Sequence, residues 1–167
     1  MRSLARARSI WLTLAVTAGC AQPAAPVPLA ARAPAMPAMP PGAPRPGEWA
    51  TWSHDQKLAY MKGGFMDAER AVFTAWEPVR YRDLSCRTCH GPGADDGRYR
   101  MPNIELTRPI RGVEGFRELA AQEPGVLRFM QKAVVPATAR LLGLPEFDMT
   151  AHTGFSCWQC HVPQEDP

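Results

Sequence analysis

The pentapeptide Cys-X-X-Cys-His occurs twice in this chain, as CRTCH from Cys86 to His90 (the first motif) and as CWQCH from Cys157 to His161 (the second motif). Two thiols three positions apart can each bond a vinyl carbon of haem, and the histidine that follows can then reach the iron. Two copies in one chain are hard to explain by chance. The sequence therefore predicts two covalently attached haem c groups, with His90 and His161 as the proximal iron ligands.

The start of the chain has the composition of a secretory signal. Arg2, Arg6 and Arg8 precede the apolar stretch IWLTLAV, and small residues follow before Cys20. The apolar stretch is too short to span a membrane. A cysteine after small residues is the pattern at which bacterial lipoproteins are cleaved and acylated, although Thr17 stands where that pattern usually has leucine. We expect residues 1–19 to be a lipoprotein signal peptide and Cys20 to carry lipid; the alternative is an unmodified cysteine in an ordinary signal peptide.

The five cysteines are all used by these predictions. Cys86 and Cys89 would hold one haem, Cys157 and Cys160 the other, and Cys20 the lipid. No thiol is then left for a disulfide or for a catalytic nucleophile.

The net charge changes when the signal peptide is removed. The whole chain has 19 Lys and Arg residues against 16 Asp and Glu residues, and three of the arginines lie in the signal. The mature chain would therefore carry 16 of each and be formally neutral. This charge gives no reason to expect nucleic acid as a partner.

Composition divides the rest of the chain into two parts. Residues 20–47 are almost wholly proline and alanine after the cysteine and lack the apolar periodicity of a core, so we expect an extended tether. Residues 48–167 would form one haem-binding domain. Such a domain is small, but two covalently held porphyrins would fill much of its interior.

A weak internal repeat precedes the two motifs. Apolar residues fall at intervals of four, seven and eleven positions in two stretches, namely Met61, Phe65, Ala68 and Val72, and Met130, Val134, Ala137 and Leu141. This spacing predicts an amphipathic helix in each half. Pro136 should bend the second helix, whereas Asp67 holds the equivalent place in the first, so we expect a bend in the second helix alone.

Turn-forming residues fill most of the remaining sequence. A short helix is predicted over Val113 to Gln122, ending before Pro124, which can occupy the first turn of the next helix. No segment alternates between apolar and polar residues, so no strand is expected. The predicted fold is all-α with long loops, a small dihaem cytochrome c domain built from two weakly repeated helix-loop-CxxCH units.

A zinc site is the competing interpretation of four cysteines in two pairs. In zinc ribbons the pairs usually lie about 15–20 residues apart, whereas 67 residues separate Cys89 from Cys157. A zinc site also gives no reason for a histidine directly after each pair.

The sixth ligand of each iron is less constrained. Only six residues follow His161, so we expect the second haem to take its distal ligand from upstream or to remain open. The principal candidates are Met61 for the first haem, Met130 for the second, and Met101, which precedes a proline in the loop after the first motif. A methionine in an apolar helical stripe is otherwise a core residue. Further candidates are Met66, Met149, and the two remaining histidines, His54 and His152, which we expect more at the surface.

Aromatic and basic residues near the motifs have expected roles beside haem. We expect aromatic side chains to pack on porphyrin edges, namely those of Trp76, Tyr81, Phe155 and Trp158. Three arginines are candidates to pair with the haem propionates or to form a solvated basic face, namely Arg87, Arg98 and Arg100.

These features together resemble known cytochromes. The lipidated cysteine, the proline-rich tether and the repeated methionine-bearing helix before each motif resemble photosynthetic reaction-centre cytochrome subunits. The phrases CRTCHG, YRMPN, FMQKAVVPATARLLG and GFSCWQCHV resemble small dihaem cytochrome lipoproteins of bacterial periplasms. The resemblance implies a periplasm-facing electron carrier. Ala21 after Cys20, rather than Asp, resembles lipoproteins sorted to the outer membrane.

Electron transfer is the function that the sequence favours. Two haems in a membrane-tethered domain would exchange electrons with redox partner proteins of the bacterial envelope, without being an enzyme. The alternative is a haem enzyme or a gas or peroxide sensor in which one iron is five-coordinate.

Overall fold

The computed structural model describes residues 35–148 and 150–164 of the chain. The expected signal peptide, Cys20 and the candidate ligand Met149 lie outside these residues. The described part is helical, with isolated bridges but no extended strand, so the predicted all-α class is confirmed. Within the same residues, no helix combines the length and apolar character needed to cross a membrane.

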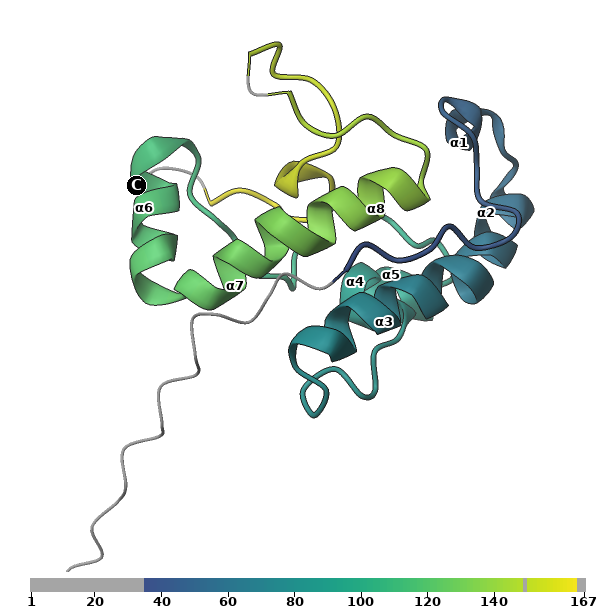
Figure 1. The fold of residues 1–167 in the computed structure, drawn as a ribbon, viewed down its shortest axis with the longest axis horizontal. Helices are drawn as coiled ribbons and strands as arrows, with labels where there is room; N and C mark the ends of the chain where they lie inside the picture. The colour runs from purple at the N-terminus through teal and green to yellow at the C-terminus, as the bar shows by residue number, and fades with distance from the viewer. Residues whose placement is uncertain (1–34, 149, 165–167) are drawn as a thin grey trace, which may run out of the picture.

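Two long helices form the centre of the domain (Figure 1). The first long helix comprises α2 (His54–Tyr60), η1 (Met61–Phe65) and α3 (Met66–Trp76). The second long helix comprises α7 (Pro124–Phe129), η2 (Met130–Val134) and α8 (Val135–Leu141). The amphipathic helices predicted from the two apolar stripes are therefore present.

Each long helix contains one widened, π-helical turn, and in both cases this turn begins at the methionine of the repeat. In the first helix Gly63 leaves the helical region, with φ −105° and ψ −110°. In the second helix the wide turn precedes Pro136, whose ring would clash with the carbonyl one regular turn earlier. The expectation of an irregularity in the second helix alone is wrong, because the glycines of the first helix permit the same distortion.

The long helices run in opposite directions and pack along α3 and α8. Small side chains at the contact, such as the fully buried Ala137, let the two backbones approach closely. At one end Trp76 stacks on Phe129, with ring centroids 4.1 Å apart. At the other end the Tyr60 hydroxyl donates a hydrogen bond of 2.8 Å to the Leu141 carbonyl. The start of each helix thus meets the end of its partner.

Shorter helices surround this pair. They are α1 (Glu48–Thr51), α4 (Cys86–His90), α5 (Pro92–Asp95), α6 (Gly112–Gln122) and η3 (Cys157–Gln159). The helix predicted over Val113 to Gln122 is confirmed as α6, and Pro124 starts α7 as expected. The chain between α5 and α6 is irregular, as its glycine and proline content predicts.

The last residues of the expected tether pack on the domain. Pro44 is buried, and the Gly47 N–H donates to the Gly143 carbonyl at 3.2 Å. Gly143 has φ +59°, and a Cβ there would lie 2.5 Å from the Arg45 carbonyl oxygen. The packed structure therefore begins before Glu48, the boundary expected from composition, because proline-rich chain can pack without any apolar periodicity.

Candidate functional site

Both motifs begin with the same local hydrogen bond. A serine precedes each first cysteine, and the side chain three positions after that serine accepts a hydrogen bond from its backbone N–H. Thr88 Oγ1 accepts from Ser85 at 3.1 Å, and Gln159 Oε1 accepts from Ser156 at 2.6 Å. This reciprocal cap fixes where each helical turn starts. It therefore fixes the spacing of the two thiols in each motif.

The motif cysteines are free thiols set against the core. The residues before the two serines, Leu84 and Phe155, are buried and anchor the motifs. Burial, with a further contribution from Glu69, raises the pKa of Cys89 to about 12 and that of Cys160 to about 11. Both groups are therefore protonated thiols at neutral pH.

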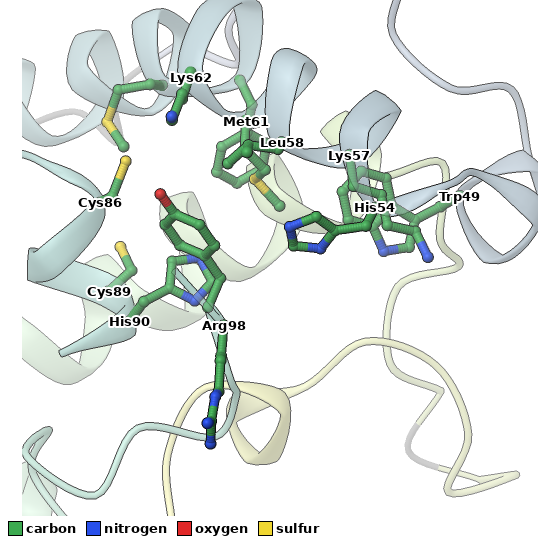
Figure 2. A pocket seen from close by; sticks show the side chains of 13 residues that line it. Trp49, His54, Lys57, Leu58, Met61, Lys62, Cys86, Cys89, His90 and Arg98 are labelled. Carbon is green, nitrogen blue, oxygen red and sulfur yellow. The ribbon is translucent and has the colours of Figure 1, made fainter. Parts of the chain in front are cut away.

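A cavity of about 800 Å³, counting its open mouth, adjoins the first motif. Cys86, Cys89 and His90 lie on one side of it, and the first long helix lies on the other (Figure 2). Its apolar and aromatic lining includes Trp49, Leu58, Phe65, Met66 and Tyr99. Cys86, Cys89 and His90 therefore face one cavity that is partly open to solvent.

Met61 and His54 are the candidate distal ligands that the structure brings to this cavity. Figure 2 shows both side chains directed from the first long helix toward the side that carries His90. Met66 also lines the cavity, whereas Met101 is not among the lining residues. His54 opens α2 and is exposed, as expected, and it also lines this cavity.

Three cationic side chains lie among the residues that line this cavity, namely those of Lys57, Lys62 and Arg98. The Lys57 ammonium lies 5.4 Å from the centroid of the Trp49 ring. The Arg98 Nε atom lies 3.9 Å from the Asp96 Oδ2 atom. An apolar cavity with cations in its lining suits an apolar group that carries carboxylates.

Of the three arginines considered as propionate partners, only Arg98 lines the cavity. Arg87 pairs with Asp95, and Arg100 pairs with Asp96 at 3.1 Å. Both arginines are exposed and already paired with a carboxylate. This arrangement matches the solvated basic face, which was the alternative to propionate binding.

His90 is held in a form that can bind a metal. Burial lowers the pKa of His90, and backbone hydrogen bonds with Arg100 and Tyr99 offset part of this effect. The Nδ1 atom is buried without a hydrogen-bond partner. The Tyr99 ring stands edge-on to the imidazole, with centroids 5.5 Å apart. A neutral imidazole is the form that coordinates a metal ion.

His161 is oriented by a backbone carbonyl. Its Nδ1 atom lies 2.7 Å from the Thr107 carbonyl oxygen. Because a carbonyl only accepts hydrogen bonds, Nδ1 must carry the proton, which leaves the lone pair of Nε2 free. Histidines that bind metals are commonly held by such a second hydrogen bond. Thr107, which sequence reasoning missed, lies in the loop after the first motif.

The candidates for the second distal ligand are more scattered. Met130 packs against the buried cluster that includes Met66 and Phe129, and Cys86 borders the same cluster. His152 is exposed in a loop with φ +52°, and its ring centroid lies 6.3 Å from that of Phe147. The described residues therefore do not bring Met130 to the second motif, and its role as a ligand stays a prediction.

The aromatic residues expected on porphyrin edges also make contacts with the protein. Trp76 and Tyr81 stack with centroids 5.9 Å apart in the core, and Phe155 is buried. The Arg111 guanidinium lies over the Trp158 side chain, 4.5 Å from the centroid of the Trp158 ring. Trp76 and Tyr81 lie at the junction between α3 and α7, and the expected contact of these aromatic residues with porphyrin stays a prediction.

Glu69 is a second residue that sequence reasoning missed. It lies on α3, is only 3% exposed, and accepts a hydrogen bond of 2.7 Å from the Thr138 hydroxyl on α8. Burial raises its pKa to about 7, and its Oε2 atom has no hydrogen-bond partner. Its position between Phe65 and Phe73 at helical spacing was the available signal, since it places a carboxyl inside the apolar stripe.

Among residues 35–148 and 150–164, no three His, Cys, Asp or Glu side chains form a group that could hold a metal ion by themselves. The two cysteine pairs are instead associated with two different core clusters, since Cys160 borders the one that contains Tyr60 and Cys86 borders the one that contains Phe73. No family model matches the chain, and no curated protein or solved structure is significantly similar to it.

Proposed function

We propose that this protein is a dihaem c-type cytochrome that carries single electrons at the bacterial cell envelope, tethered to the membrane through Cys20. The observation that carries the proposal is the cavity in which the complete first motif faces Met61 and His54. A CxxCH motif needs a space of this kind beside it, since the porphyrin must lie between the proximal histidine and a distal side chain.

The residues around the first motif fit a haem. The cavity beside this motif is lined mainly by apolar side chains with a few polar groups, as cofactor sites are. Lys57, Lys62 and Arg98 offer positive charge for two propionates. His90, neutral and with an unpartnered Nδ1, offers a ring nitrogen to iron. When bound, the haem supplies reversible one-electron chemistry at its iron.

The second motif is supported by its own geometry. The His161 Nδ1 contact with Thr107 leaves Nε2 available as a ligand. The serine cap before Cys157 repeats the cap before Cys86. A helix with a widened turn at a methionine precedes both motifs. These shared features favour two haems over one.

The chain's own residues would then hold the haems and set their environment. The caps fix the thiols for thioether attachment, and each histidine would offer a ring nitrogen to its iron. Phe65, Met66 and Leu58 exclude water from the first haem. Exclusion of water and the choice of distal ligand are the means by which a protein tunes a haem potential.

Haem content tests the proposal directly. The full chain is expressed in a bacterium that attaches haem c, and covalent haem per chain is measured by denaturing haem stain and by mass. We expect two haems in the wild type, one in Cys86→Ser/Cys89→Ser, and one in Cys157→Ser/Cys160→Ser. Cys20→Ser is the control, which should keep both haems and leave the membrane fraction. A wild type without covalent haem contradicts the proposal.

Carbon monoxide separates electron transfer from the enzyme or sensor alternative. An iron with two protein ligands binds carbon monoxide slowly, because a ligand must leave first. We expect slow binding at the first haem of the reduced protein. Rapid binding at either haem would instead favour a haem enzyme or a gas sensor.

A further inference from the structure

Asn103 joins the two motifs through two hydrogen bonds. Its side-chain Nδ2 donates to the Cys89 carbonyl at 3.1 Å, and its backbone N–H donates to the Cys160 carbonyl at 2.9 Å. Each acceptor belongs to the second cysteine of its motif. A parallel bridge pairs Asn103 with His161 directly.

The orientation of the Asn103 side chain is fixed from both sides. Its Oδ1 accepts the Glu105 N–H at 2.9 Å, so Nδ2 is the atom left to face Cys89. Gly91, which follows the first motif, has φ +55°, and a Cβ there would lie 2.5 Å from Asn103 Oδ1. The residue is only 4% exposed. An amide held in this way cannot turn to another partner without leaving buried groups unpaired.

We propose that Asn103 is a positioning residue that sets the placement of the two haem-binding motifs relative to each other and provides a hydrogen-bonded route between them. The inference rests on the proposed function. The route runs from the Cys89 carbonyl through the Asn103 side chain and backbone to the Cys160 carbonyl. Electron exchange between two haems depends steeply on their separation, so a residue that fixes both motifs controls its rate.

Two variants separate the side-chain bond to the first motif from its neighbours. Asn103→Asp keeps an oxygen for the Glu105 N–H and loses the donor to Cys89. Asn103→Leu loses both side-chain bonds, and both variants keep the backbone N–H that bonds Cys160. Gln122→Glu is the control for the added charge, since it makes the same amide-to-carboxylate change on the exposed face of α6.

Electron exchange is measured on the full holoprotein after rapid injection of less than one electron per molecule. We expect both Asn103 variants to keep two haems with unchanged absorbance spectra and to exchange electrons between haems at least threefold more slowly. Gln122→Glu should match the wild type. Loaded Asn103 variants that exchange at the wild-type rate would overturn the inference.

A measurement on the wild type covers variants that fail to fold or to bind haem. In the reduced protein, nuclear magnetic resonance should detect couplings across the hydrogen bonds from Asn103 to the Cys89 and Cys160 carbonyl carbons, with slow exchange of both amides. Fast exchange without these couplings overturns the inference. A wild type that lacks haem altogether contradicts the proposed function instead, while the couplings would still report on the Asn103 contacts.

Discussion

At the scale of single residues, Met61 and His54 compete for one position in the first cavity. Both point from the first long helix toward the first motif. Met61 begins the widened turn, and its own backbone is still α-helical, with φ −60° and ψ −41°. His54 opens α2, next to the serine that caps that helix.

We therefore predict that Met61 is the sulfur ligand of the first iron. Met61→Ala should remove at least half of the weak near-infrared sulfur-to-iron band of the oxidised protein and lower the potential of one haem, because a thioether ligand raises it. His54→Ala should leave the band unchanged. A band that Met61→Ala leaves unchanged, with a shifted potential in His54→Ala alone, would assign the position to the histidine.

Glu69 makes stability depend on pH. Its folded-state pKa of about 7 lies above the ordinary value of 4.5, so the fold favours the protonated form. Its contribution to stability is complete below about pH 4.5 and is lost as the pH rises through 7, by roughly 3 kcal/mol. Glu69→Gln, which keeps an oxygen for Thr138, should flatten this part of the unfolding free energy profile.

The check is denaturant unfolding of the holoprotein between pH 4.5 and 8. The exposed Glu118→Gln on α6 serves as the matched control and should follow the wild-type profile. Equal slopes in the wild type and Glu69→Gln would show that Glu69 is ionised without cost in the fold.

The sequence predicted those site residues whose roles follow from local spacing. The CxxCH pentapeptides required no knowledge of the fold. Thr107 and Asn103 were not predictable, because they act through backbone groups that only the folded loop brings to the second motif. Lys57 and Lys62 were missed because a lysine on a helix is usually solvated, and only the packing of α2 beside the first motif makes them part of a cavity.

At the scale of elements, both long helices contain a widened turn, and only the first of these turns includes a non-helical residue, Gly63. Apolar spacing predicted both long helices. The widened segment in each comprises only five residues, so it shifts the apolar stripe of the helix without ending it. Spacing did not predict the shared irregularity. Gly63 and Pro136 act through different physical effects, one by permitting unusual dihedral angles and the other by removing a hydrogen bond.

Gly64, the neighbour of Gly63, lets Pro40 of the expected tether pack closely on the first long helix. This close contact leads to a prediction. A Cβ on Gly64 would lie 2.7 Å from the Pro40 Cβ, whereas nothing lies within 4 Å of a Cβ on Gly125 in α7. Gly64→Ala should destabilise the protein by roughly 1–3 kcal/mol. Gly125→Ala should stabilise it by about 0.4–1 kcal/mol. Chemical denaturation of both variants provides the check, and a Gly64→Ala protein as stable as Gly125→Ala would contradict the close packing.

At the scale of the whole molecule, the two halves are interleaved. Tyr60 bonds Leu141, Glu69 bonds Thr138, and the loop after the first motif supports the histidine of the second. A sequence repeat of two units suggested two modules in series. Both units contribute residues to each of the two core clusters, so neither half buries its apolar face alone.

We predict a single cooperative unfolding transition for this reason. Haem absorbance and far-ultraviolet circular dichroism should report the same midpoint. Tyr60→Phe should lower the free energy of unfolding by about 1–3 kcal/mol, and the common midpoint with it, since the buried Leu141 carbonyl loses its donor. Tyr81→Phe is the control, because the Tyr81 hydroxyl makes no hydrogen bond within the described residues. Two separated transitions would mean that the halves unfold independently.

The packing of residues 40–47 has a mechanical consequence for a chain anchored at its N-terminal end. Tension arrives first at this segment, which is held by separate contacts, such as Pro40 on Gly64 and Gly47 on Gly143. Because these contacts lie at different positions along the segment, we expect them to break one after another from its N-terminal end. Eight residues drawn straight span at most about 25–30 Å. The helix pair and the cavity would carry no load until that length is used.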